Sequence, residues 1–207
     1  MQPTNETNGV ERERIYGFLA GVFGSAPTAD GAHAVSQMAL ALKIPCPDGQ
    51  ALDQLEREFM DLFVVPNPRY VTPYESAYRD RWLLPTGLGK DATEQVVGRL
   101  LMGESTLAVR QCFLDAGTLP LQDLPDHIGN ELRLMAHLWA SEDQESGGLG
   151  SRRELRAKVR DEHLLQWIGK LRQKVSENES LGFYSAALDL AEMILNNDEQ
   201  EDAATPR

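Results

Sequence analysis

Apolar residues recur at α-helical spacing along most of this 207-residue chain, and no stretch of useful length alternates as a β-strand does. Residues 51–65, for example, place Leu52, Leu55, Phe59 and Phe63 at helical spacing. The same pattern predicts helices over 10–24, 31–43, 91–116 (one or two, interrupted near Gly103), 125–141, 154–177 and 181–195. The sequence therefore predicts an all-α, single-domain helical bundle.

A proline-rich segment interrupts this pattern in the first half of the chain. Pro66, Pro68 and Pro73 occur within eight residues and forbid a regular helix there. We therefore predict a long ordered loop over residues 64–90. The segment also contains four large aromatic residues, namely Tyr70, Tyr74, Tyr78 and Trp82. A loop with this many rings packs them onto the body of the protein or offers them to a ligand.

The two ends of the chain differ from the middle in composition. Residues 1–9 are polar, and residues 197–207 are acidic and poor in large apolar side chains. Such composition favours disorder. We therefore expect a disordered lead over 1–9, one helical domain over 10–196, and a disordered acidic tail over 197–207.

The charge of the chain limits its partners. The formal net charge is -12, which argues against nucleic acid and anionic membrane surfaces and favours a basic partner. No apolar run approaches the ~18 residues that a membrane span requires. Cys46 and Cys112 fit no metal or redox spacing, so we interpret both as small buried residues. These features predict a cytoplasmic protein that is not inserted in a membrane.

Polar residues gather where the segment Leu121–Ala140 begins its apolar helical run. Pro125 and Asp126 suit a helix start, and His127 and Glu131 are spaced to share one face. A metal site needs three or four ligands, and this group supplies two, so we predict no metal. Acid–base catalysis by Asp126 and His127 remains an alternative, although no nucleophile motif accompanies them. A third reading is that both residues only cap the helix.

Three segments together resemble one protein family. Residues 55–80, LEREFMDLFVVPNPRYVTPYESAYRD, resemble the LF…P…PYESVY segment of the TorD/DmsD/NarJ family of redox-enzyme maturation chaperones. Residues 124–132, LPDHIGNEL, resemble its E-P-x-D-H-I-x-x-E-L signature, although here Asp123 and Leu124 precede the proline. Residues 161–195 resemble its closing pattern, with a histidine and a tryptophan followed by Phe-Tyr. The order of the three segments also matches.

The resemblance implies a cytoplasmic chaperone of the TorD type rather than an enzyme, with no cofactor of its own. Its partner would be the catalytic subunit of a molybdenum oxidoreductase. The chaperone would bind the twin-arginine signal peptide, the apoprotein or both, and would assist insertion of the molybdopterin cofactor before export. Either a monomer or a dimer fits this role.

A signal peptide has a basic start and an apolar centre, so its chaperone needs acidic groups beside an apolar or aromatic groove. We expect this groove between the 70–82 loop and the 123–131 turn. The candidate client-binding residues are Tyr70, Tyr74, Glu75, Ser76, Tyr78, Trp82, Asp123, Pro125, Asp126, His127 and Glu131.

Overall fold

The structure is a computed structural model that describes residues 5–47, 49–86, 93–99, 101–121, 124–140 and 152–204. Its elements are α1 (Asn5–Gly24), α2 (Ala29–Ala41), α3 (Leu52–Phe59), the π-helical η1 (Met60–Val64), α4 (Ser76–Arg79), β1 (Arg81–Thr86), β2 (Thr93–Arg99), α5 (Glu104–Asp115), α6 (Ile128–Ala140), α7 (Arg152–Lys158), the π-helical η3 (Val159–Leu164), α8 (Leu165–Asn178) and α9 (Phe183–Ala204). The prediction of an all-α bundle is confirmed, with one small hairpin added.

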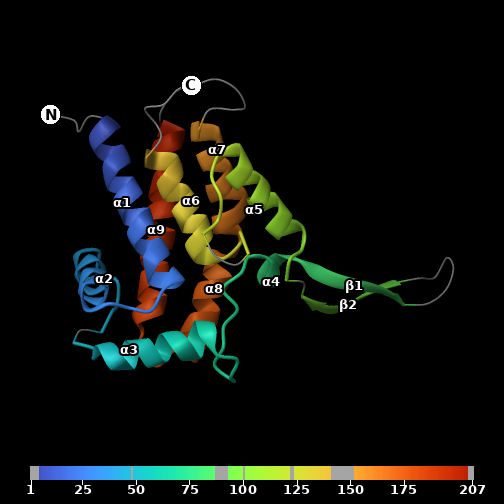
Figure 1. Cartoon of the computed structure of the whole chain (residues 1–207), viewed down its shortest axis with the longest axis horizontal. Helices are drawn as coiled ribbons and strands as arrows, with labels where there is room; N and C mark the ends of the chain where they lie inside the picture. Colours follow the sequence, from blue (N-terminus) through green and yellow to red (C-terminus); the bar gives the residue numbers. More distant parts are fainter. Residues whose placement is uncertain are drawn as a thin grey trace.

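Helix α6 lies at the centre of the bundle, between α1 and the α7–α8 segment (Figure 1). Its apolar side chains, including Ile128, Leu132, Met135 and Leu138, are fully buried. Such burial on all sides is typical of a core helix. Helix α3 lies across one end of the bundle, next to the start of α6 (Figure 1). None of the described helices combines the length and apolar character that crossing a membrane requires.

The prediction of helix over residues 91–116 is wrong for the described residues before Gly103, namely 93–99 and 101–102. Strand β2 pairs antiparallel with β1, from Arg81 opposite Arg99 to Thr86 opposite Thr93, and the resulting hairpin projects from the helical body (Figure 1). Helix starts only at Glu104, in α5. The predicted loop over 64–90 likewise contains α4 and β1. Neither strand alternates strictly between apolar and polar residues, so the sequence carries only a weak periodic signal for them.

The predicted disordered ends are helical over most of their length. Helix α1 begins at Asn5 and α9 continues to Ala204, while residues 1–4 and 205–207 lie outside the described part. The buried Asp198 explains the extension of α9. Its carboxylate accepts a hydrogen bond from Tyr16 at 2.6 Å and pairs with Arg12 at 2.8 Å, which fastens the end of α9 to α1.

Asp80 joins α4 to the start of α5. Its carboxylate accepts hydrogen bonds from the Ser105 backbone N–H (3.0 Å) and hydroxyl (2.8 Å), so it caps α5 from outside that helix. A Cβ atom on Gly103 would collide with the same carboxylate. The contact therefore requires glycine at position 103 and fixes α5 beside the base of the hairpin.

Replacing Asp80 by alanine removes this cap. We expect Asp80→Ala to lower the free energy of unfolding by ~1–2 kcal/mol, measured by urea denaturation. Asp115→Ala is the matched control, because Asp115 is an exposed aspartate at the opposite end of α5. Equal stabilities of the two variants would contradict the capping role.

Candidate functional site

Backbone hydrogen bonds join the aromatic loop, residues 70–82, to the turn before α6. Tyr74 and His127 form an isolated antiparallel bridge. The N–H of Glu75 donates to the Asp126 carbonyl at 2.9 Å, and the N–H of Ile128 donates to the Pro73 carbonyl at 3.0 Å. Two segments about fifty residues apart thus lie against each other, held by the main chain.

Asp126 is fully buried at this junction. Its Oδ2 accepts a hydrogen bond from the Ser76 N–H at 3.0 Å, at the first residue of α4. The sequence had suggested that Pro125 and Asp126 form the first turn of α6. Helix α6 instead starts at Ile128, so Asp126 and the buried Pro125 precede it. The Asp126 carboxylate therefore accepts a backbone hydrogen bond at the start of α4 and not at the start of α6.

His127 provides the cap of α6. Its Nδ1 accepts a hydrogen bond from the Gly129 N–H at 3.0 Å, and its ring packs edge-on against Tyr74 with centroids 5.2 Å apart. A Cβ at Gly129 would lie 3.1 Å from the Ala20 carbonyl oxygen and 3.2 Å from His127 Nδ1. Glycine thus lets the end of α1 approach the first turn of α6.

Two buried glutamates extend the junction into the core. Glu75 pairs with Arg79 and accepts a hydrogen bond from His163 Nδ1 at 2.9 Å. Burial lowers the pKa of His163, but hydrogen bonds to Cys112 and Glu75 and the charge of Glu75 outweigh it and raise this pKa to about 9. His163 is therefore a cation at neutral pH, held beside the Glu75 carboxylate.

Glu131 is the second buried glutamate, and its pKa is raised. Burial, followed by the nearby charge of Glu75, raises the pKa of Glu131 well above its usual value, against the opposing effect of a hydrogen bond from Trp167 Nε1 at 3.3 Å. Asp126 adds to the rise. Burial and the neighbouring charges therefore favour the protonated form of Glu131, because a further close negative charge in the core would be costly.

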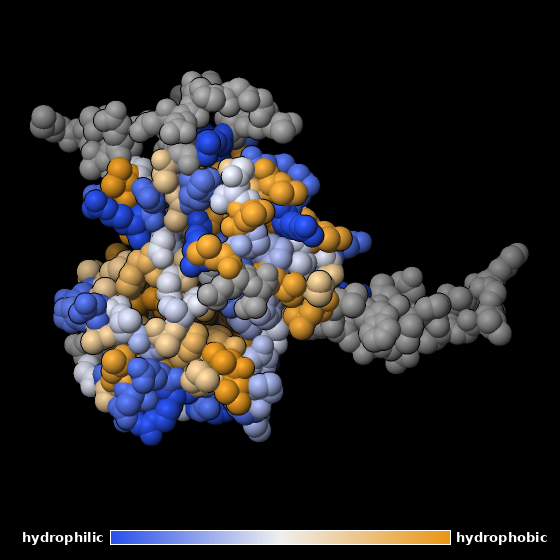
Figure 2. Space-filling view, in the orientation of Figure 1, coloured by the Kyte–Doolittle hydropathy of each residue, from blue (hydrophilic) through white to orange (hydrophobic). Residues whose placement is uncertain are grey.

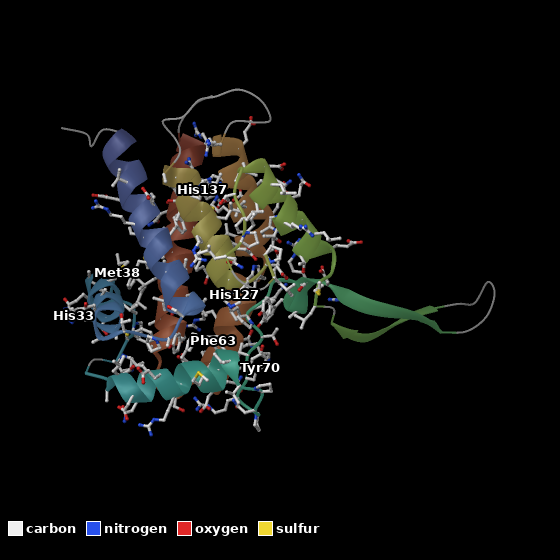
Figure 3. The ribbon with its side chains drawn as sticks, viewed as in Figure 1. His33, Met38, Phe63, Tyr70, His127 and His137 are labelled. Carbon is white, nitrogen blue, oxygen red and sulfur yellow. The ribbon has the colours of Figure 1, made fainter. Side chains whose placement is uncertain are left out.

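A pocket of about 380 Å³ opens beside this junction. Figure 3 shows His127, Phe63 and Tyr70 together, where the start of α6 approaches the end of α3, and Figure 2 shows hydrophobic residues gathered on that part of the surface. The lining residues are Phe23, Gly24, Ser25, Phe59, Phe63, Val64, Tyr70, Tyr74, Leu121, His127, Gly129, Asn130 and Arg133. Five parts of the chain contribute: the end of α1, the α3–η1 segment, the aromatic loop, Leu121, and the start of α6 with the preceding His127.

The structure places seven of the eleven candidate residues in two groups. Tyr70, Tyr74 and His127 line the pocket. A second group lies in the core at 0% exposure, namely Glu75, Ser76, Asp126 and Glu131. Acidic groups of this second set thus lie behind the pocket wall and not on it.

Three other candidates lie elsewhere. Tyr78 is half-buried and packs on Trp167, with ring centroids 5.4 Å apart. Trp82 belongs to β1, but its side chain and the whole of Asp123 lie outside the described part of the chain.

Of the thirteen described lining residues, the sequence had indicated only Tyr70, Tyr74 and His127 for the site. Phe59 and Phe63 were assigned to the helix face only, while Phe23 and Arg133 were not considered for the site. The first two lie within the segment that carries the family resemblance, which was the available signal. Phe23 and Arg133 had no comparable signal, because α1 and the second turn of α6 meet the loop only in three dimensions.

The geometry gives the alternative of acid–base catalysis little support. The Asp126 carboxylate faces Ser76 in the core, whereas the His127 ring lies on the pocket wall with Nδ1 accepting a backbone hydrogen bond. Among the residues that the structure describes, no cluster of His, Cys, Asp or Glu side chains could hold a metal ion.

The raised pKa of Glu131 predicts a stability that depends on pH. Its pKa is raised in the folded state from 4.5, so its contribution is fully present below pH 4.5 and is lost as the pH rises. His163, raised from 6.5 to about 9, adds a second loss between these two values. Each group lowers the free energy of unfolding by ~1.4 kcal/mol per pH unit inside its window.

Glu131→Gln removes the first loss but keeps an oxygen to accept from Trp167. We expect this variant to be more stable than the wild type by ~1 kcal/mol or more at neutral pH, and the gain to shrink as the pH falls toward 4.5, in urea unfolding at several pH values. Glu56→Gln, at an exposed position of α3, is the control. A gain that does not vary with pH would show that Glu131 is ionised in the folded protein.

Comparison with known proteins agrees with this architecture. Residues 27–173 match the family model described as the nitrate reductase delta subunit. A protein from Vibrio cholerae named chaperone protein TorD is 30% identical over 147 residues, and its counterpart in another strain is 29% identical. These matches span 70% of this chain but 60% of each relative.

The fold has a solved counterpart. A protein from Archaeoglobus fulgidus, described as a candidate redox enzyme maturation protein, superposes with a TM-score of 0.53 at 18% identity, covering 95% of this chain and 96% of its own. At this identity the likeness concerns the fold. The family match covers both the aromatic loop and the turn before α6, and it confirms the resemblance found in the sequence. The chain therefore belongs to the nitrate reductase delta subunit family, which includes TorD-like proteins.

Proposed function

We propose that this protein is a client-specific chaperone and not an enzyme. Its client would be the catalytic subunit of a molybdopterin-containing oxidoreductase. In the cytoplasm it would bind the twin-arginine signal peptide, the apoprotein or both, and would assist cofactor insertion before export. The relatives named as TorD chaperones support this class of function.

The observation that carries the proposal is the aromatic pocket beside His127. Its volume of about 380 Å³ lies near the lower end of the range for ligand sites, so it suits a few side chains of a peptide and not a folded domain. Phe59, Phe63, Tyr70 and Tyr74 provide rigid apolar walls. Aromatic anchors of this kind supply much of the binding energy in peptide recognition.

The charge of the protein supports a cationic client at longer range. A net charge of -12 would steer a basic peptide end toward the surface, with an effect that weakens at high salt. Glu75, Asp126 and Glu131 are unsuited to direct contact because they are fully buried and held within the core. We therefore assign these carboxylates the role of positioning the loop and His127.

The enzyme alternative that uses His127 and Asp126 is disfavoured by the same geometry. A general acid and base must reach one substrate together. The Asp126 carboxylate is buried against α4, and no substrate in the pocket would touch it without rearrangement of the junction.

The pocket assignment can be tested with a synthetic peptide that carries the twin-arginine signal sequence of a candidate molybdoenzyme catalytic subunit. We expect Tyr70→Ala to weaken binding about tenfold or more in calorimetric titration, because an anchor ring is lost. Tyr70→Phe keeps the ring and should bind within about twofold of the wild type.

His127→Ala is a second test of the pocket, and His33→Ala is its matched control. His33 is exposed on α2, away from the pocket (Figure 3). Circular dichroism and urea unfolding of each variant separate lost binding from lost folding. Unchanged affinity in folded Tyr70→Ala and His127→Ala would remove the pocket from the client-binding site.

A further inference from the structure

The wall of the pocket carries an unexpected charge. Its thirteen described lining residues contain no aspartate or glutamate. Arg133 contributes a cation to this wall, and His127 accepts a hydrogen bond at Nδ1. A pocket that took the arginines of a signal peptide would require the opposite charge on its wall.

Arg133 is set apart from comparable arginines of this protein. Arg12, Arg69 and Arg79 are partly buried, and each pairs with a carboxylate. Arg133 is also partly buried, yet within the part of the chain that the structure describes it forms no ion pair. Its Nη1 donates only a long hydrogen bond, 3.4 Å, to Asn130 Oδ1. The guanidinium thus retains donor groups beside the aromatic wall.

A second role for Arg133 has to be distinguished from ligand binding. Its Nη2 lies near Gly24, the last residue of α1. A cation at the end of a helix interacts favourably with the last carbonyl groups. This role would affect the stability of the protein but would give the pocket no preference for a charged ligand.

We propose that the pocket selects a client segment in which an apolar side chain is accompanied by a nearby aspartate or glutamate. The apolar side chain would pack between Phe63, Tyr70 and Tyr74, and the Arg133 guanidinium would pair with the carboxylate. This inference rests on the proposed function and adds a rule for the client sequence. Arginine suits the role because its planar fork binds a carboxylate through two parallel hydrogen bonds.

The rule also gives the client a direction of charge. The basic end of the segment would remain outside the pocket, on the acidic surface of a chain with net charge -12. The acidic residue would lie next to the apolar anchor, inside. A segment with its basic residues beside the anchor would place like charges together near Arg133, which opposes binding.

A charge-reversal experiment tests the proposal. Two peptides share the client sequence and the apolar anchor, and carry either aspartate or lysine beside it. Both are acetylated and amidated, so that terminal charges do not contribute. We expect the wild type to bind the aspartate peptide about tenfold more tightly, Arg133→Gln to bind both alike, and Arg133→Glu to prefer the lysine peptide.

Arg110→Glu is the matched control, because it makes the same change of charge at an exposed position on α5. It should leave the preference of the wild type unchanged. An aspartate preference that survives in folded Arg133→Glu, or a wild type indifferent to the charge, would overturn the inference. If Arg133 only interacts with the last carbonyl groups of α1, Arg133→Gln should be less stable than the wild type, and the ratio of the two affinities should not change.

Failure of the rule for the client sequence is distinguishable from failure of the proposed function. If the wild type binds neither peptide, nor the natural signal sequence, the client-binding role itself is contradicted. If binding occurs and depends on Tyr70 but ignores the neighbouring charge, only the rule for the client sequence is lost.

Discussion

The buried carboxylate of Asp126 is the interaction on which the rest of this structure depends. It binds the first N–H of α4, while its own backbone carbonyl accepts from Glu75. Removing either bond would leave a polar group unsatisfied in the core. The position of Tyr74 is set by the bond from the Ile128 N–H to the Pro73 carbonyl together with these two bonds of Asp126. His127, the next residue, is placed on the pocket wall by the same turn.

Helices with a continuous apolar face could be predicted from the sequence. The run from Leu52 to Phe63 and the central helix were recognised from their spacing, because such a helix carries its own signal in the order of its residues. The β1–β2 hairpin was missed because its hydrogen bonds join two segments that each lack strict alternation. The extension of α9 to Ala204 depends on Asp198, whose partners lie in α1, and an acidic tail gave no sign of them.

The candidate site was predictable as a region but not as a surface. Sequence reasoning placed the 70–82 loop beside the 123–131 turn, and the backbone bridge between Tyr74 and His127 joins these two segments. It assigned Asp126 and Glu131 to the surface of a groove because a signal peptide with a basic start would need acidic groups there. Their burial depends on contacts with Ser76 and Trp167. Arg133 gave no signal in the sequence. Its proposed role depends on the absence of an ion pair with any described carboxylate, and this absence is visible only in three dimensions.

Gly129 has a consequence for the way this family can change. The distance between α1 and the first turn of α6 is set there by contact between two main chains, with no side chain between them. Glycine inside a helix costs ~0.5–1 kcal/mol relative to alanine, so this close approach is obtained at some expense of local stability. The α1–α6 side of the pocket is consequently set by the backbone. Under the proposed function, substitutions at Tyr70, Phe63 or Arg133 would alter what the pocket recognises while this side stays the same, and one scaffold could then acquire different clients.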